Sequence, residues 1–219
     1  VAELVLGMTT DTLDSEGEVI TECGVDVSDS RIKDAVNSFV GKIEQIPPMY
    51  SAIKQNGKKL YELARAGITT ERKSRTVNIY KIEIIEINHE RMSVTIDVRC
   101  SKGTYIRTLC EDIGMKLGVG AYMNTLMRIE SGGFSIDDCN DIADVKRMFE
   151  ENRINTIVIP IDSIFSSYPS VTLNEKQTAH IKNGVQVSAP GICDGRKYRV
   201  YAGSGEFLCV CECIGGRLR

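Results

Sequence analysis

The sequence predicts an α+β fold, with a mixed, mainly antiparallel sheet in a larger domain and a small β-barrel-like module after it. Two β-rich runs, 76–87 and 92–100, flank the polar turn 88–91, and this order favours an antiparallel hairpin. Capped helices are expected before and after this hairpin. Beyond about residue 165, short strands alternate with glycine-rich turns, as in small barrel-like modules.

The N-terminal part begins with a predicted strand over Val1–Leu6, which starts without a cap or a polar leader. We therefore expect the chain to begin inside a fold, with an unpaired strand edge through which it could self-associate. The acidic stretch 11–17 is rich in turn residues. A helix is predicted over 31–40 because Ser28-Asp29-Ser30 can cap it and apolar residues follow at helical spacing.

The middle of the chain is interrupted by Pro47-Pro48, after which Met49 and Tyr50 are expected to be extended or in a turn. A short basic helix is predicted over 58–66, ended by Gly67. Further helices are predicted over 108–117 and about 121–128.

A boundary is predicted between about 155 and 165, where prolines and serines cluster. After it, Asn174 can cap a short helix that Gly184 ends. The expected strands of the module are 185–188, 197–202 and 206–213.

Composition excludes several classes of protein. The 219 residues are 42% hydrophobic and 26% charged, which is typical of a globular chain with a sizeable core. No apolar run approaches the ~20 residues needed to cross a bilayer, so no membrane association is expected. The eight cysteines contain no CxxC pair, and reduced cysteines of this kind are typical of cytoplasmic proteins. No HExxH, Walker or dinucleotide-binding pattern occurs, so neither a metal nor a cofactor is implied.

Charge is distributed unevenly along a chain of net charge −3. Residues 1–30 hold eight acidic residues and no Lys or Arg, whereas residues 42–81 hold nine Lys or Arg against three Glu. A basic segment on an acidic protein can attract a polyanion locally. An ordinary solvated helix face is the alternative, and composition does not separate the two.

The most informative stretch is SKGTYIRTL, residues 101–109. If the chain is extended here, Tyr105 and Arg107 point the same way, because residues two apart on a strand share a face. An aromatic ring beside a forked cation suits a flat base next to a carboxylate or phosphate. The alternative is an exposed pair at the end of a strand.

Four segments stand out in this order: LGMTTDTLDSEG (6–17), IEQIPPMYSAIKQNGKKLYELARAG (43–67), CSKGTYIRTLCEDIG (100–114) and GAYMNTLMRIESGGF (120–134). Together they resemble the TruB family of bacterial tRNA pseudouridine synthases. The resemblance runs to about residue 134, and the tail from about 163 is similar to that family's PUA RNA-binding module. The resemblance implies a sheet of the pseudouridine synthase type, with a partial catalytic domain over 1–160 and a PUA-like module over 163–219.

The resemblance also implies an activity and its site. Such enzymes flip a uridine out of the T-loop of tRNA, position 55, and reattach its base through carbon, with an aspartate as nucleophile. The partner is thus the T-arm of tRNA. Tyr105 would pack on the flipped base, Arg107 would pair with the nucleophile, Asp14 would orient Arg107, and Leu126 would line the base pocket. For Asp14, a turn aspartate that caps its own backbone is the alternative.

The stretch from about Gly41 to Thr70 corresponds to the family's RNA-gripping thumb. Its candidate phosphate contacts are Lys54, Lys58, Lys59 and Arg65. Met49 and Tyr50 are either RNA contacts or core residues.

One departure from the family concerns the nucleophile. The family carries it in a GHTGTLDP-like motif, which these residues do not contain, and a second family tyrosine is also missing. We therefore expect an N-terminally truncated catalytic domain that is inactive alone. Two alternatives stay open: a noncatalytic RNA-binding or RNA-chaperone module, and a purely structural fragment.

Overall fold

The computed structural model describes residues 1–55 and 57–219, which form two compact units, Val1–Ser131 and Gly132–Arg219. The stretch 132–165 consists of a two-residue strand, short helices and turns, and buries none of its side chains. It therefore has no core of its own, although it groups with the second unit. The predicted functional division near residue 160 remains a prediction.

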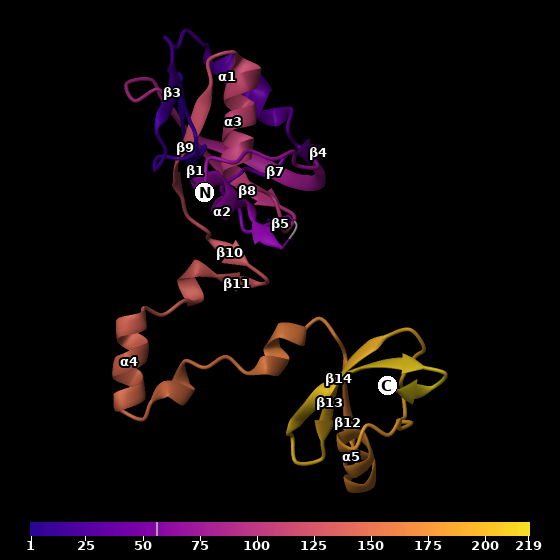
Figure 1. Cartoon of the computed structure of the whole chain (residues 1–219). Coiled ribbons are helices and arrows are strands. Elements are labelled where there is room, and N and C mark those ends of the chain that lie inside the picture. Colours follow the sequence, from indigo (N-terminus) through magenta and orange to yellow (C-terminus); the bar gives the residue numbers. More distant parts are fainter. Residues whose placement is uncertain (56) are drawn as a thin grey trace. The chain divides into compact units, whose positions relative to one another are not determined.

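The first unit is built around a five-stranded antiparallel sheet of order β4-β7-β8-β1-β9 (Figure 1). The predicted α+β class with a mainly antiparallel sheet is confirmed. The strands of this unit are β1 (Ala2–Leu6), β2 (Met8–Thr10), β3 (Val19–Glu22), β4 (Gly41–Gln45), β5 (Lys54–Gln55), β6 (Lys58–Lys59), β7 (Arg75–Asn88), β8 (Ser93–Cys100), β9 (Ala121–Leu126) and β10 (Glu130–Ser131). Its helices are α1 (Asp29–Asn37), α2 (Leu60–Arg65) and α3 (Ile106–Leu117).

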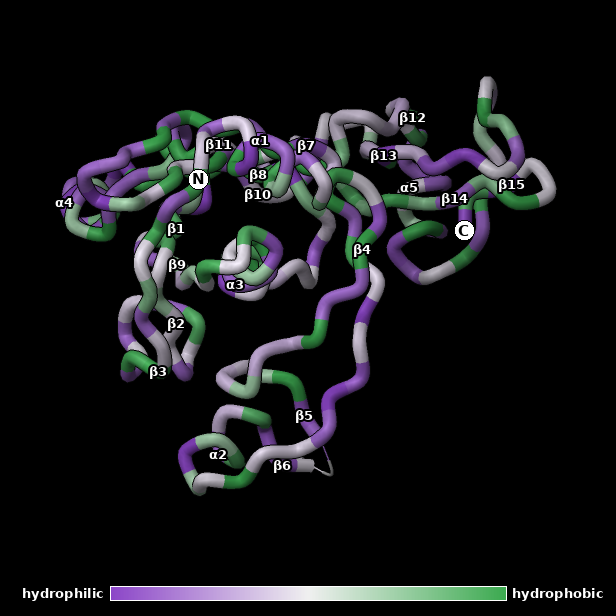
Figure 2. The backbone as a smooth tube through the Cα atoms, turned by 90° about the horizontal axis from the view of Figure 1, so that it is seen from above, coloured by the Kyte–Doolittle hydropathy of each residue, from purple (hydrophilic) through white to green (hydrophobic). Residues whose placement is uncertain are grey.

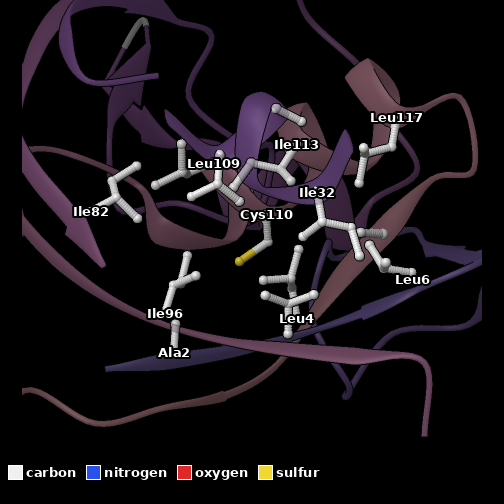
Figure 3. Close-up of a cluster of buried hydrophobic side chains, with 14 of the residues drawn as sticks. Ala2, Leu4, Leu6, Ile32, Ile82, Ile96, Leu109, Cys110, Ile113 and Leu117 are labelled. Carbon is white, nitrogen blue, oxygen red and sulfur yellow. The ribbon is translucent and has the colours of Figure 1, made fainter. Parts of the chain in front are cut away.

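The core of this unit lies between the sheet and the helices α1 and α3 (Figure 3). Alternate residues of β1 are buried, and they meet the apolar face of α3. The side chains of Leu4, Ile96, Leu109, Cys110 and Ile113 are fully buried there. Because α3 is fixed along its length by this packing, its first turn is held in place at the edge of the core.

Several predicted elements are confirmed. Ser28 caps α1 and accepts a hydrogen bond from Arg31 N. Strands β7 and β8 form the predicted hairpin. Residues 1–6 do form a strand, but β1 lies between β8 and β9 and pairs with both. The predicted unpaired edge at Val1–Leu6 is therefore wrong, and so is self-association through it.

Two other predictions are wrong. A helix was predicted over about 121–128, but residues 121–126 form the strand β9, which completes the sheet beside β1. Tyr105 and Arg107 do not lie on an extended segment. Helix α3 begins at Ile106, so Tyr105 is its N-cap and Arg107 is its second residue.

Residues 46–74 leave the sheet after β4 and return at β7, and Figure 2 shows them as an excursion carrying β5, β6 and α2. We call this segment the thumb excursion. It begins later than predicted, because Gly41–Gln45 pairs with β7 in the central sheet. Arg72 Nη1 donates to Pro47 O at 3.0 Å and so joins its two ends. Leu60 of α2, 2% exposed, is buried within it.

The second unit holds a curled sheet of order β12-β13-β14-β15 with its own core. Asn174 caps α5 as predicted. Of the predicted strand 185–188, only a bridge at Val187 forms.

All eight cysteines of the chain are free. The elements of this unit are β11 (Phe134–Ser135), η1 (Ile136–Asp138), α4 (Ile142–Glu150), η2 (Ile154–Thr156), η3 (Ile161–Phe165), β12 (Ser170–Leu173), α5 (Glu175–Lys182), β13 (Lys197–Ala202), β14 (Phe207–Ile214) and β15 (Arg217–Leu218).

Candidate active site

Asp14 lies in the acidic loop that joins β2 to β3, and its carboxylate is held by its own loop. Thr12 Oγ1 donates to Asp14 Oδ1 at 2.5 Å, and Glu16 N donates to the same oxygen at 3.2 Å. Thr10 Oγ1 also donates to the backbone carbonyl of Asp14 at 2.7 Å. Oδ1 is therefore bound within its own turn, as the alternative interpretation of Asp14 expects, and Oδ2 is left for another partner.

Strand β9 fixes this loop against the sheet. Met123 N donates to Leu13 O and Ser15 N donates to Met123 O, both at 3.0 Å, so Asp14 and Met123 form a parallel bridge. Leu13 adopts a φ of 66° here, an uncommon conformation for a leucine. Hydrogen bonds on both sides of Asp14 hold its carboxylate at a set distance from α3.

Arg107 joins three separate parts of the chain through its guanidinium. Its Nη1 lies 2.8 Å from Asp14 Oδ2 and donates to Thr12 O at 3.3 Å. Its Nη2 donates to Tyr50 O at 2.6 Å. The side chains of Arg107 and Asp14 are only 23% and 19% exposed. Partial removal from water strengthens such a charge-assisted pair and makes either partner costly to leave unpaired.

Tyr105 precedes the helix that carries Arg107, and it is half-buried. The side chain of Gln45 binds its backbone: Tyr105 N donates to Gln45 Oε1 at 3.0 Å, and Gln45 Nε2 donates to Tyr105 O at 3.2 Å. The structure thus brings Tyr105, Arg107 and Asp14 together at the first turn of α3. No direct hydrogen bond joins Tyr105 to Arg107 among the described residues.

The apolar candidates lie around this site in different ways. Leu126 ends β9, the strand that holds the Asp14 loop, and it is 51% exposed. Tyr50 reaches the site through its backbone carbonyl, and Met49 accepts a turn hydrogen bond from Ser51 N at 2.9 Å. Both are half-buried. Of these three, Tyr50 is the one that forms a hydrogen bond with Arg107.

The candidate phosphate contacts all lie on the thumb excursion. Lys54, Lys58 and Arg65 are exposed, and Lys59 is half-buried. Lys59 Nζ donates to Tyr61 Oη at 3.1 Å and lies 5.2 Å from the centre of the Tyr61 ring. Arg65 lies 5.6 Å from the same ring. The tyrosine therefore gathers two of the four cations into one basic patch, as cation–π contacts do.

The sequence prediction missed two groups near α3. The first is Gln45, only 1% exposed; its signal was period-two alternation with Ile43, which places it on an inward face. The second is the acidic pair Glu111 and Asp112. Burial raises the pKa of Asp112, and it also raises the pKa of Glu111, where the charge of Asp112 adds to the effect and Arg72 opposes it. Raised carboxyl pKa values are common near functional sites.

The first turn of α3 therefore presents a partly desolvated cation that is fixed on one side by a carboxylate and on the other by the thumb excursion. Within residues 1–55 and 57–219, no three His, Cys, Asp or Glu side chains converge to hold a metal ion. None of the described helices has the length and apolar content required to span a bilayer. The arrangement suits binding and orienting an anionic group beside a flat ring.

Three family descriptions cover nearly the whole chain. Residues 1–106 match the N-terminal domain of the TruB family pseudouridylate synthases. Residues 107–166 match the C-terminal domain of tRNA pseudouridylate synthase B, and residues 169–219 match the C-terminal part of pseudouridine synthase II TruB.

Curated relatives agree with these matches. The chain is 45% identical over 211 residues to tRNA pseudouridine synthase B of Clostridium perfringens strain 13, covering 94% of this chain and 70% of that protein. It is 44% identical to the protein of the same name from Alkaliphilus oremlandii, with 95% and 67% covered. For that of Aromatoleum aromaticum the identity is 38%, with 98% and 68% covered.

Solved structures share the fold at lower identity. The structure of an H/ACA RNP bound to a substrate RNA containing 2′-deoxyuridine matches with a TM-score of 0.62 and 22% identity, over 97% of this chain and 58% of that chain. A Cbf5–Nop10–Gar1 complex matches with a TM-score of 0.56 and 22% identity, over 97% and 59%. The predicted pseudouridine synthase type of sheet is thereby confirmed.

Proposed function

Because the chain belongs to the TruB family of pseudouridylate synthases, we propose that it forms part of an enzyme that isomerises the T-loop uridine of tRNA, position 55, to pseudouridine. In this reaction the bond from N1 of the base to C1′ of the ribose breaks and a bond from C5 to C1′ forms. C5 loses its proton, and N1 gains a proton in place of its bond to C1′. Atoms and electrons balance within the substrate, so the reaction needs no oxidant and no cofactor.

The proposed roles follow from the geometry around α3. Tyr105 packs on the everted base, since stacking on an aromatic ring replaces the stacking lost on flipping. Arg107 pairs with the nucleophilic aspartate and keeps it ionised, and Asp14 holds Arg107 in place. Leu126 forms an apolar wall of the base pocket.

The observation that carries this proposal is the placement of the Arg107 guanidinium. Two of its nitrogens are fixed by Asp14, Thr12 O and Tyr50 O, and its side chain is mostly shielded from water. A fixed cation that does not have to reorient during the reaction is what electrostatic stabilisation of a charged nucleophile requires.

The thumb excursion is the proposed grip on the T-arm. Its cations Lys54, Lys58, Lys59 and Arg65 would contact phosphates, and Met49 and Tyr50 would lie at its root. Phosphate contacts orient an RNA and carry little sequence information, so the choice of uridine rests with the site at α3. We place the protein in the cytoplasm, where its proposed substrate and its free cysteines both fit.

Neutralising the thumb cations should weaken RNA binding in a salt-dependent way. The double variant Lys58→Gln, Lys59→Gln is expected to flatten the negative slope of log K against log salt concentration by up to about two units, because each phosphate contact contributes about one unit. Titrations of a T-arm stem-loop at several salt concentrations measure that slope. The matched control is Lys146→Gln, on α4 outside the thumb excursion. An equal change of slope in that variant would contradict a specific role of the thumb cations in phosphate binding.

The proposed activity is tested with an extended protein, defined as these residues preceded by a segment that carries a GHTGTLDP-like motif. We expect it to convert the T-loop uridine of a stem-loop to pseudouridine, and to leave uridines in the stem unmodified. The 219 residues without that segment are expected to bind the stem-loop and not to modify it. RNA binding without conversion by the extended protein would favour the noncatalytic RNA-binding or RNA-chaperone alternative.

A further inference from the structure

Gln45 connects the root of the thumb excursion to the start of α3. It is the last residue of β4, directly opposite Arg75 of β7, so the excursion leaves and re-enters the sheet beside it. Sixty residues further along the chain, its side chain meets the backbone of Tyr105. With 1% of its surface exposed, Gln45 is among the largest fully buried side chains of the first unit and the only polar one in that group among the described residues.

Both ends of the Gln45 amide are used at Tyr105. Its oxygen accepts the N–H of Tyr105 at 3.0 Å, and its nitrogen donates to the Tyr105 carbonyl at 3.2 Å. The same carbonyl accepts the helical hydrogen bond from Leu109 N at 3.0 Å. The N–H of an N-cap residue has no acceptor inside its own helix, and the side-chain oxygen of Gln45 supplies one.

This pairing adds to the helical hydrogen bond from Leu109 N in fixing the backbone of Tyr105. Tyr105 has φ −95° and ψ 106°, an extended conformation at the step from loop to helix. Two hydrogen bonds from one rigid, buried amide set the orientation of both peptide groups of that residue. The direction of the Cα–Cβ bond, and hence the range of ring positions, follows from them.

We propose that Gln45 is a positioning residue of the site: it holds Tyr105 at the place where the everted pyrimidine base packs. This inference rests on the proposed function for the identity of that base. A second contact, from Arg107 Nη2 to Tyr50 O, ties the same root of the excursion to the same turn of α3. RNA held by the excursion is thereby kept in register with Tyr105 and Arg107 by two adjacent links.

The first test measures hydrogen exchange in the 219-residue chain itself. The amide of Tyr105 is expected to be protected, and Gln45→Met should lower its protection at least tenfold, because methionine fills the same volume without an acceptor. The matched control is Gln177→Met: Gln177 accepts from Asn174 N and donates to Ser188 O in the second unit. Unchanged protection of Tyr105 in Gln45→Met would overturn the inference.

The second test measures kinetics in the extended protein. Gln45→Met is expected to lower kcat about 10- to 100-fold, since a displacement of about 1 Å in a positioned group has effects of that size. The KM for the stem-loop should stay within about twofold, because the phosphate contacts are untouched. A shift in KM with kcat unchanged would show a structural or binding role instead and would contradict the positioning role.

A double-mutant cycle separates positioning from general loss of stability. If Gln45 acts through Tyr105, then Gln45→Met should lower kcat no further in a Tyr105→Ala background, while its effect on the melting temperature persists. Full additivity in kcat would overturn the inference. Should Gln45→Met fail to fold, Gln45→Asn keeps the amide but is one methylene too short, and the same outcomes apply to it.

These results also distinguish the inference from the proposed function. If the extended protein with Gln45 intact does not isomerise uridine, the function fails, whereas hydrogen exchange still reports on the link to Tyr105. If that protein is active and Gln45→Met retains its full kcat, the positioning role fails and the function stands.

Discussion

Arg107→Lys in the extended protein is expected to lower the rate of isomerisation by about 10²–10³, the usual loss when one fixed electrostatic group is removed from a reacting centre. Lysine keeps the charge, but its single ammonium cannot reach Asp14, Thr12 O and Tyr50 O in the way the fork of Arg107 does. The cation would therefore be mobile where the nucleophile needs it fixed. Single-turnover assays at saturating stem-loop measure this rate.

The same variant is expected to fold and to bind RNA normally, because α3 is held by its apolar face and the phosphates are bound elsewhere. Arg99→Lys, at an exposed position on β8, is the matched control and should keep the full rate. If Arg107→Lys were as fast as the control, Arg107 would not be the partner of the nucleophile.

Asp14→Asn should have the next largest effect. The substitution preserves shape and removes the charge, and one amide group then has to face the Nη1 donor of Arg107. Breaking a largely buried ion pair by removing one partner is costly, and we expect a loss of about 2 kcal/mol in the free energy of unfolding. Denaturant titration of the 219-residue chain measures that loss.

The rate should fall as well, about 10- to 100-fold in the extended protein, because an unanchored Arg107 is no longer held on the nucleophile. Asp11→Asn is a control within the same loop: Asp11 Oδ1 accepts from Glu18 N and does not contact Arg107. Equal losses in both variants would mean that Asp14 only shapes the loop.

Much of the fold could be predicted locally, and the exceptions have physical reasons. The strand β8, the hairpin to β7 and the caps at Ser28 and Asn174 were all predicted, because alternation and capping are local signals. The stretch 121–126 has no strong preference for helix or strand. It is a strand because β1 offers it an open edge to pair with, and such pairing depends on residues more than a hundred positions away.

For the candidate site, the sequence identified the residues better than their backbone geometry. The resemblance singled out Tyr105, Arg107 and Asp14, and the structure brings all three to one turn of α3, although their catalytic roles remain proposals. The extended geometry assumed for Tyr105 and Arg107 was wrong, since the helix starts directly after Tyr105. Alternation with Ile43 indicates only that Gln45 faces inward, and its role was missed because the backbone it binds lies sixty residues further along the chain.

The most direct measurement is a photo-crosslink between the 219-residue chain and a T-arm stem-loop that carries 5-iodouridine at the target position. Aromatic rings stacked on this base react with it on irradiation, so the crosslink reports which ring touches the everted base. We expect it on Tyr105, in the tryptic peptide 103–107, and we expect its loss when the label moves to a uridine in the stem. Crosslinks confined to the thumb excursion or the second unit, with none in peptide 103–107, would contradict a base pocket at the start of α3.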